Sequence, residues 1–296
     1  MDARYNAAMS MLASFLRRKK WVWVGIASDD VWISLAVVRM GYASSAFAFV
    51  YDLAAQRMIA DVTLLGPPGA AEVGDDHANL LSRFDFRGNI AIAAAGTELA
   101  ITGKLGAIEL DVTIETGAPS VSANARVGEG LYSFTEKRLL AATRGRVVVG
   151  GRSISLDGAL GGWDYTNGMM PRHTRWRWAF GMGRDRGGSP IGFNLTQGFV
   201  GEAECVAADA SRTYPLGEPR IVYDEARPES PWRLFGDGID LVFTPGGVHA
   251  QRTNLGLVRS KFLQPAGLFR GSLRIGGETV EVDRLAGVVE DQDVLW

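Results

Sequence analysis

Side chains able to do chemistry are densest between Asp164 and Gly183, where the sequence reads DYTNGMMPRHTRWRWAFGMG. In a β-strand, successive side chains point to opposite faces. Alternation would place Thr174, Trp176, Trp178, Phe180 and Met182 on one face, and Arg175, Arg177 and Ala179 on the other. One face is therefore strongly aromatic. Such a face either fills a core or lines a pocket for a hydrophobic ligand.

Asp164 is the first acid/base candidate of this segment. An apolar surround would raise the pKa of its carboxyl group toward neutrality, where proton transfer is most effective. The alternative is that Asp164 to Gly168 form a turn, because Asp and Asn side chains bond their own backbone and Gly tolerates positive φ. The sequence leaves both interpretations open.

The remaining site candidates follow from position. As catalytic groups we consider Glu290, Asp291 and His173 besides Asp164, and as substrate-binding groups Tyr165, Arg172, Trp176, Trp178, Phe180, Phe193 and Asn194. Two carboxylates together, or one beside a histidine or arginine, could protonate a double bond or remove a proton. Glu136, Lys137 and Arg138 are weaker candidates. A single histidine beside an arginine can equally be an ordinary surface residue, and the arginines can pair with carboxylates across strands.

Composition argues against several classes of function. The formal net charge is only -2, which does not favour a nucleic-acid partner. The histidines, His77, His173 and His249, are scattered, and no His or Cys pair has the spacing of a metal site. No glycine signature indicates NAD, a flavin or ATP. Catalysis, if present, is expected to be acid/base chemistry without a metal or cofactor.

The single cysteine, Cys205, has apolar neighbours and is expected to be a buried, unreactive thiol. No apolar run is long enough for an integral membrane span. Residues 5–16 have helical hydrophobic spacing and precede the basic run 17–20, which is the wrong order for a signal peptide. We expect a cytoplasmic protein whose residues 5–20 either pack as a lead-in helix or contact a membrane surface.

From Trp21 onward the chain reads as short β-rich runs bounded by Gly, Asp, Asn or Pro, at roughly ten-residue spacing. The 37 glycines suit many tight turns. The run 21–38 reads as a hairpin about Ser28, Asp29 and Asp30. The pattern predicts an all-β, antiparallel sandwich or barrel.

The chain also repeats itself. Residues 144–164 resemble residues 269–291 without a gap, each copy being a hairpin that turns on Gly-Gly and ends at an acid, Asp164 or Glu290. In addition, Trp21 and Trp23 match Trp176 and Trp178, each pair at the head of a strand. The order of the two signals predicts a duplication, with a lead-in at 1–20, a first domain at 21–160 and a second at 161–296, although short hairpins can also be alike by chance.

A resemblance to a family accompanies these patterns. DYTNG, RHTRWRWAFG, IGFNL at Ile191–Leu195, GVVEDQDVLW at Gly287–Trp296, and the earlier RRKKWVWVG and LAVVRMGY resemble the bacterial domain-of-unknown-function 2804 family over nearly the whole chain. More remotely, that family looks like the lipocalin-like two-barrel group of carotenoid 1,2-hydratases, AttH-like proteins and fungal pericyclases. The resemblance implies two calycin-type barrels, a ligand pocket, and cofactor-free chemistry on hydrophobic molecules. Hydratases carry their acid in a motif with His and Trp neighbours that DYTNG does not reproduce, so their catalytic residues are not transferred.

Three functional hypotheses follow. The first is a cofactor-independent lyase, hydratase or isomerase acting on a hydrophobic or aromatic small molecule. The second is a non-catalytic, lipocalin-like binder or carrier of a hydrophobic ligand. The third is a structural or interaction domain whose aromatic face is entirely core. The polar groups beside the aromatic face favour the first.

Overall fold

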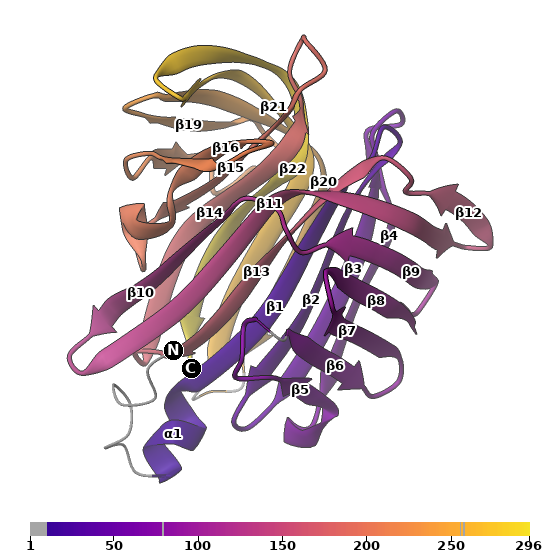
Figure 1. Cartoon of the computed structure of the whole chain (residues 1–296). Coiled ribbons are helices and arrows are strands. Elements are labelled where there is room, and N and C mark those ends of the chain that lie inside the picture. The colour runs from indigo at the N-terminus through magenta and orange to yellow at the C-terminus, as the bar shows by residue number, and fades with distance from the viewer. Residues whose placement is uncertain (1–10, 79, 255, 257) are drawn as a thin grey trace.

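A computed structural model describes residues 11–78, 80–254, 256 and 258–296 (Figure 1). Part of the expected segment 5–20 therefore lies outside the described residues. What is described of it forms α1, Met11–Arg17, and the start of the first strand. Within the described residues, no helix is long and apolar enough to cross a membrane.

Two antiparallel sheets account for most of the chain. The first contains β1 Arg18–Ala27, β2 Val31–Met40, β3 Ser44–Asp52, β4 Arg57–Gly66, β5 Ala71–Val73, β6 Leu81–Asp85, β7 Asn89–Ala95, β8 Glu98–Leu105, β9 Ile108–Glu115, β10 Ser120–Gly128, β11 Leu131–Val149, β12 Arg152–Ser155 and β13 Ala159–Met169. The second contains β14 His173–Arg184, β15 Pro190–Gln197, β16 Val206–Asp209, β17 Thr213–Pro215, β18 Arg220–Val222, β19 Trp232–Gly236, β20 Ile239–Asn254, β21 Arg259–Ile275 and β22 Glu278–Leu295. Short 3-10 helices span Pro68–Ala70 and Gly201–Glu204.

The first sheet curls into a nearly closed barrel and the second into a half-barrel (Figure 1). This confirms the predicted all-β, lipocalin-like fold. The expected hairpin about Ser28 to Asp30 joins β1 to β2. In the middle of the molecule, β13 pairs with β1 on one side and β11 on the other, while β14 pairs with β22.

The sheets change later in the chain than the predicted division at residue 160. β13 is the last strand of the first sheet, so residues 161–169 belong with the first half and not the second. The DYTNG segment is therefore strand and not turn. Pairing with β1 and β11 on both edges keeps these polar residues extended.

The repeated hairpins adopt the same turn. Gly150 and Gly151 have φ of 56° and 87°, and Gly276 and Gly277 have 63° and 91°. Two successive residues with positive φ define a tight hairpin turn that glycine forms without steric strain. The second echo also has structural meaning, because Trp23 lies opposite Asp164 in the β1–β13 ladder as Trp178 lies opposite Glu290 in the β14–β22 ladder.

Three clusters of buried apolar side chains make up the core. One fills the first barrel, one fills the second half, and the third lies between the two sheets. The predicted alternation of β14 is confirmed, because Trp178, Phe180 and Met182 join the cluster between the sheets while Ala179 points into the second half. The aromatic face of β14 is thus the surface on which the two halves meet.

Close backbone approach at the strand centres requires glycine. A Cβ added at Gly287 would lie 2.2 Å from the carbonyl oxygen of Phe180 and 2.8 Å from the Cα of Gly181. Neither neighbour is the end of a flexible side chain, so the backbone itself would have to move.

We expect Gly287→Ala to lower the free energy of unfolding by about 1–3 kcal/mol, the range found for overpacked sites. Chemical denaturation measures this change. The matched control is Gly117→Ala, because a Cβ there has no atom within 4 Å; its effect should stay within about 0.5 kcal/mol. Equal stability of the two variants would contradict the close packing described for β22.

Candidate functional site

A cavity of about 340 Å³ lies where the two halves meet. Its wall is mostly aromatic and aliphatic and comes from both sheets. The residues used below that line it are Trp21, Trp23, Met40, Tyr42, Leu65, Thr135, Lys137, Asp164, Thr166, Trp176, Trp178, Thr196, Glu204, Gln264, Glu290 and Trp296. An apolar cavity with a few polar groups is typical of sites for small hydrophobic ligands.

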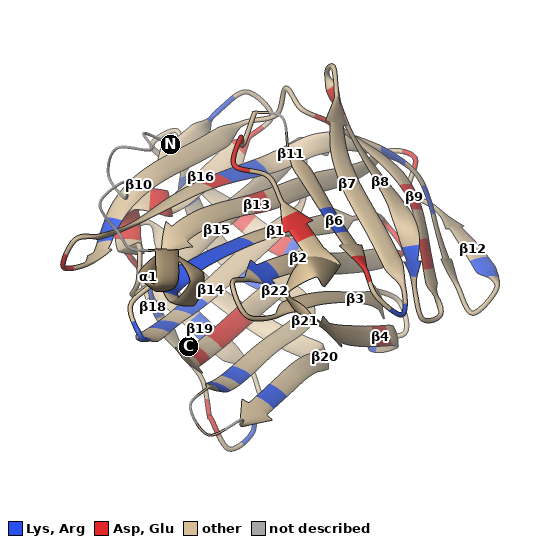
Figure 2. Ribbon diagram, turned by 90° about the horizontal axis from the view of Figure 1, so that it is seen from below, with Lys and Arg blue, Asp and Glu red and all other residues tan. Residues whose placement is uncertain are grey.

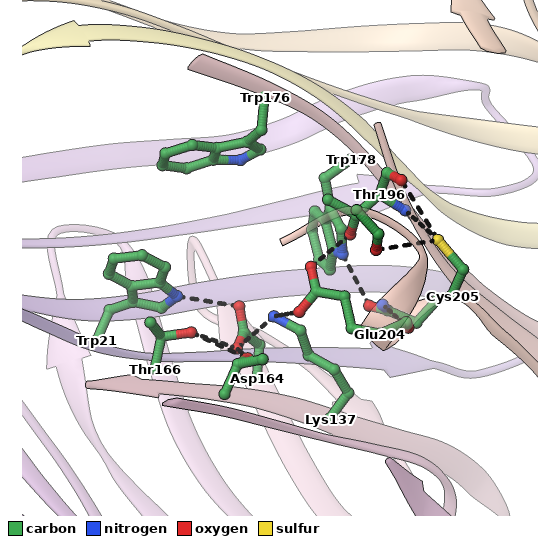
Figure 3. Close-up of polar contacts among 12 residues, drawn as sticks. Trp21, Lys137, Asp164, Thr166, Trp176, Trp178, Thr196, Glu204 and Cys205 are labelled. Atoms are coloured by element: carbon green, nitrogen blue, oxygen red, sulfur yellow. Dashed lines mark hydrogen bonds and ion pairs between the residues drawn. The ribbon is translucent and has the colours of Figure 1, made fainter. Parts of the chain in front are cut away.

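The two halves contribute matching elements to the wall, of which Figure 3 shows the Trp21–Asp164 contact and the ring of Trp176. The indole N–H of Trp21 donates to Asp164 Oδ2 over 2.9 Å, and that of Trp176 donates to Glu290 Oε1 over 2.8 Å. The two indole rings stack, with centroids 6.0 Å apart and planes at 17°. The two halves thus build one site, with one tryptophan and one carboxyl group from each half.

Asp164 belongs to a buried polar cluster around Lys137 (Figure 3). Lys137 Nζ lies 2.6 Å from Asp164 Oδ1 and 3.4 Å from Glu204 Oε2. Thr135 and Thr166 also donate to Asp164 Oδ1, over 3.3 and 3.0 Å. The oxygens of Asp164 are therefore fully engaged, which suits a residue that holds Lys137 in place.

Burial and charge act in opposite directions on this cluster. Burial alone would lower the pKa of Lys137, but Asp164 and Glu204 outweigh it and raise the pKa above its ordinary value. Burial raises the pKa of Glu204, although Lys137 opposes this shift. Lys137 therefore remains an ammonium ion inside the cavity.

Glu290 has a different environment. Gln264 Nε2 donates to Glu290 Oε2 over 2.6 Å, and the indole N–H of Trp176 donates to Glu290 Oε1. Among the described residues, Glu290 takes part in no ion pair. Burial raises the pKa of Glu290 to about 7, against the lowering effect of these two hydrogen bonds. The charge of Asp164 raises the pKa further. Glu290 can thus hold or release a proton near neutral pH.

Glu204 is held by contacts from β15. Asn194 accepts a 2.7 Å hydrogen bond from the indole N–H of Trp178 and donates to the Glu204 carbonyl over 2.8 Å. Thr196 Oγ1 donates to Glu204 Oε1 over 2.5 Å. Cys205 Sγ exchanges hydrogen bonds with the backbone of Thr196, and burial raises the pKa of this thiol to about 12, as expected for an unreactive cysteine.

Several predicted catalytic residues lie outside the cavity. Asp291 follows Glu290 on β22 and faces the other way, accepting a 2.6 Å hydrogen bond from Tyr223. His173 is exposed and lies 2.7 Å from Asp293. The carboxyl groups of Asp164 and Glu290 are the predicted acid/base groups that the fold brings to one cavity.

The predicted binding residues divide similarly. Trp176 and Trp178 line the cavity. Tyr165 faces the core of the first barrel, and its hydroxyl donates to the Gly74 carbonyl. Arg172 is exposed and contacts the backbone of Trp296. Phe180 and Phe193 are buried in the core. Asn194 does not line the cavity and accepts a hydrogen bond from the indole N–H of Trp178.

In the sequence, Lys137 was only a weaker candidate for the site, and Glu204 and Gln264 were not among the candidates. Lys137 occupies a strand position between apolar runs, where an unexplained charge signals a buried partner. Gln264 lies before the repeated segment 269–291, so the echo does not identify it; in the structure it contacts the carboxyl group of β22 as Lys137 contacts that of β13. Glu204 has none, since it enters from a 3-10 helix.

Among the described residues, no group of three His, Cys, Asp or Glu side chains has the arrangement of a metal site.

Comparisons with known proteins agree with this architecture. The family described as Domain of unknown function (DUF2804) matches residues 3–296. No match is found among curated proteins. Similar crystal structures include an AttH-like protein from Nitrosomonas europaea (11% identity, TM-score 0.56, covering 96% of both chains) and kievitone hydratase from Nectria haematococca (15%, 0.55, covering 97% of this chain and 94% of that one). CghA with Sch210972 is also similar (12%, 0.58, covering 94% and 88%). At these identities the likeness establishes the fold.

The Lys137 cluster can be tested through stability. Lys137→Met should lower the free energy of unfolding by about 3–5 kcal/mol, because it leaves buried carboxylates without their cation. Adding Asp164→Asn should recover part of the loss. The control is Arg146→Met, which breaks an exposed pair with Asp111 and should leave the unfolding midpoint nearly unchanged. A Lys137→Met protein as stable as wild type would contradict the cluster.

The protonation of Glu290 should appear in the pH dependence of stability. Its pKa is raised from 4.5 to about 7, so the folded state binds the proton more tightly than the unfolded state. This group therefore makes the free energy of unfolding fall as pH rises from about 4.5 to about 7, by at most about 1.4 kcal/mol per pH unit. Glu290→Gln should lack that fall. Glu278→Gln, an exposed change on the same strand, should keep it; identical profiles for wild type and Glu290→Gln would exclude the raised pKa.

Proposed function

The chain belongs to the domain-of-unknown-function 2804 family, and we propose that it is a cofactor-independent hydratase or isomerase for a hydrophobic or aromatic small molecule. The observation that carries this proposal is the placement of Glu290, a buried carboxyl group in a cavity walled by indoles, where burial raises its pKa to about 7. General acids and bases are most effective when their pKa lies near the working pH.

Glu290 is the proton carrier in this proposal. Trp176 and Gln264 fix the orientation of its carboxyl group from both oxygens, which aims it at one position of a bound ligand. Because burial raises the pKa of Glu290 to about 7, its protonated and charged forms have similar free energies near that pH.

Lys137 supplies fixed positive charge. An ammonium ion held in a buried site stabilises negative charge that develops on a ligand oxygen, and it does so without reorganising at the moment of reaction. Asp164 and the two threonines keep Lys137 in place. We therefore assign Asp164 to positioning and not to proton transfer.

In a hydration, carboxyl groups of the cavity act as both proton donor and proton acceptor. Glu290 gives its proton to one carbon of a double bond, water adds to the other carbon, and the proton that the water loses passes to a carboxylate, Glu204 or Glu290 itself. An isomerisation uses the same carboxyl group without water, taking a proton from one carbon and returning it to another. Both reactions need only groups that the cavity contains.

The structural neighbours support this proposal without identifying a substrate. One is named a hydratase, and another was crystallised with the small molecule Sch210972. Together with the acid, the ammonium and the indoles in the cavity, they favour an enzyme over the alternative, a non-catalytic carrier of a hydrophobic ligand.

The test is turnover of a panel of aryl alkenes and aryl enones in water labelled with oxygen-18. Mass spectrometry distinguishes hydration, which adds one labelled water, from isomerisation, which adds none. On a compound that wild type converts, Glu290→Gln should lower kcat by about 10² to 10⁴. Asp293→Asn, which changes an acid on the same strand outside the cavity, should leave kcat unchanged.

Saturable binding of these compounds, detected by quenching of tryptophan fluorescence, with no product from any of them would favour the carrier instead. Undiminished turnover by Glu290→Gln would remove the proposed role of this residue.

A further inference from the structure

The helix α1 has an unusual surface for a packed element. None of its residues is buried, and Met11, Leu12, Phe15 and Leu16 expose 91%, 67%, 46% and 49% of their surface. Single exposed apolar side chains are common, but several together on one short element indicate an interaction surface.

This helix is fixed at the mouth of the cavity. The ring of Phe15 meets that of Tyr42 edge-on at 6.5 Å. Lys19 Nζ donates to the Leu16 carbonyl over 2.6 Å and lies 4.8 Å from the ring of Tyr42 and 5.0 Å from that of Trp296. Tyr42 and Trp296 both line the cavity. The contacts that anchor α1 are therefore made with the cavity rim.

The rim itself carries a further exposed apolar side chain. Leu65, at the end of β4, lines the cavity and is 55% exposed. Met40, at the end of β2, lines it as well. Apolar groups thus lead from the surface at α1 and β4 toward the cavity interior.

Basic residues lie on and beside α1 (Figure 2). Arg17 ends the helix, and Arg18, Lys19 and Lys20 follow it in sequence, the two lysines being buried. Arg39 and Arg172 act electrostatically on Lys20 and Tyr42. Asp75 pairs with Arg18 and Lys20, and the side chains of Arg39 and Arg172 are exposed to solvent. The face that carries α1 is therefore basic as well as apolar.

We propose that this face docks on an anionic phospholipid surface, with the apolar side chains of α1 entering the headgroup boundary and the accessible arginines Arg17 and Arg39 meeting the lipid phosphates. Apolar side chains beside arginine and lysine are the combination that interfacial segments use. A lipid surface is also where apolar small molecules concentrate, and docking in this orientation lets them enter the cavity without crossing water. The inference goes beyond the proposed reaction and holds equally for a carrier.

The test is sedimentation of the full-length protein with vesicles of phosphatidylcholine alone or with phosphatidylglycerol. We expect binding to the phosphatidylglycerol vesicles that weakens as salt increases, because the electrostatic part of the attraction is screened. Met11→Gln/Leu12→Gln should reduce binding at least tenfold. These side chains are exposed, so the variant should keep the wild-type unfolding midpoint, which thermal denaturation checks.

The matched control is Val242→Gln, an equivalent change at an exposed apolar residue of β20. Val242 pairs with Arg270, and neither residue lines the cavity. It should bind vesicles as wild type does. The proposal is overturned if wild type stays in solution with both kinds of vesicle, or if the helix variant binds like wild type. It is also overturned if the helix residues instead drive self-association, seen as a change in size on gel filtration. Binding is measured without substrate, so a failure of the proposed reaction leaves this test unaffected.

Discussion

One ammonium group faces three carboxyl groups inside a mostly apolar cavity, and much of the site follows from that imbalance. Among the described residues of the wall, Lys137 is the cation, and Asp164, Glu204 and Glu290 are the acids. The nearest two acids share Lys137, which leaves Glu290 with neutral donors. Burial of an unpaired carboxylate is unfavourable, so Glu290 retains its proton to near neutral pH.

The two halves contribute the same kind of frame to the cavity, and it is asymmetric in one respect. Each half supplies an indole N–H to a carboxyl group, and the indoles stack across the boundary. On the neighbouring strand, however, the first copy has Lys137 and the second has Gln264. A lysine creates a fixed charge pair, whereas an amide only orients a carboxyl group. Two equivalent positions thereby acquire different protonation behaviour.

The fold and half of the site could be predicted from the sequence. Turn signals predicted the β class. The echo gave Glu290 the position in the second half that Asp164 has in the first, because ungapped hairpins keep their register. The same period of two excludes Tyr165 and Asp291, each of which directly follows a cavity residue and so points away. DYTNG looked like a turn because local chemistry favours one, yet pairing on both edges holds it extended. Glu204 depends on long-range contacts with Asn194 and Thr196 that no local pattern encodes.

The central claim is that Glu290 is a neutral acid at pH 6 and a carboxylate at pH 8. Infrared difference spectroscopy of the wild-type protein between these two pH values measures this directly through the carbonyl stretch of a protonated carboxyl group. We expect a band that disappears as pH rises and is absent from Glu290→Gln. A wild-type spectrum without that band, or a band that persists in the variant, would contradict the account.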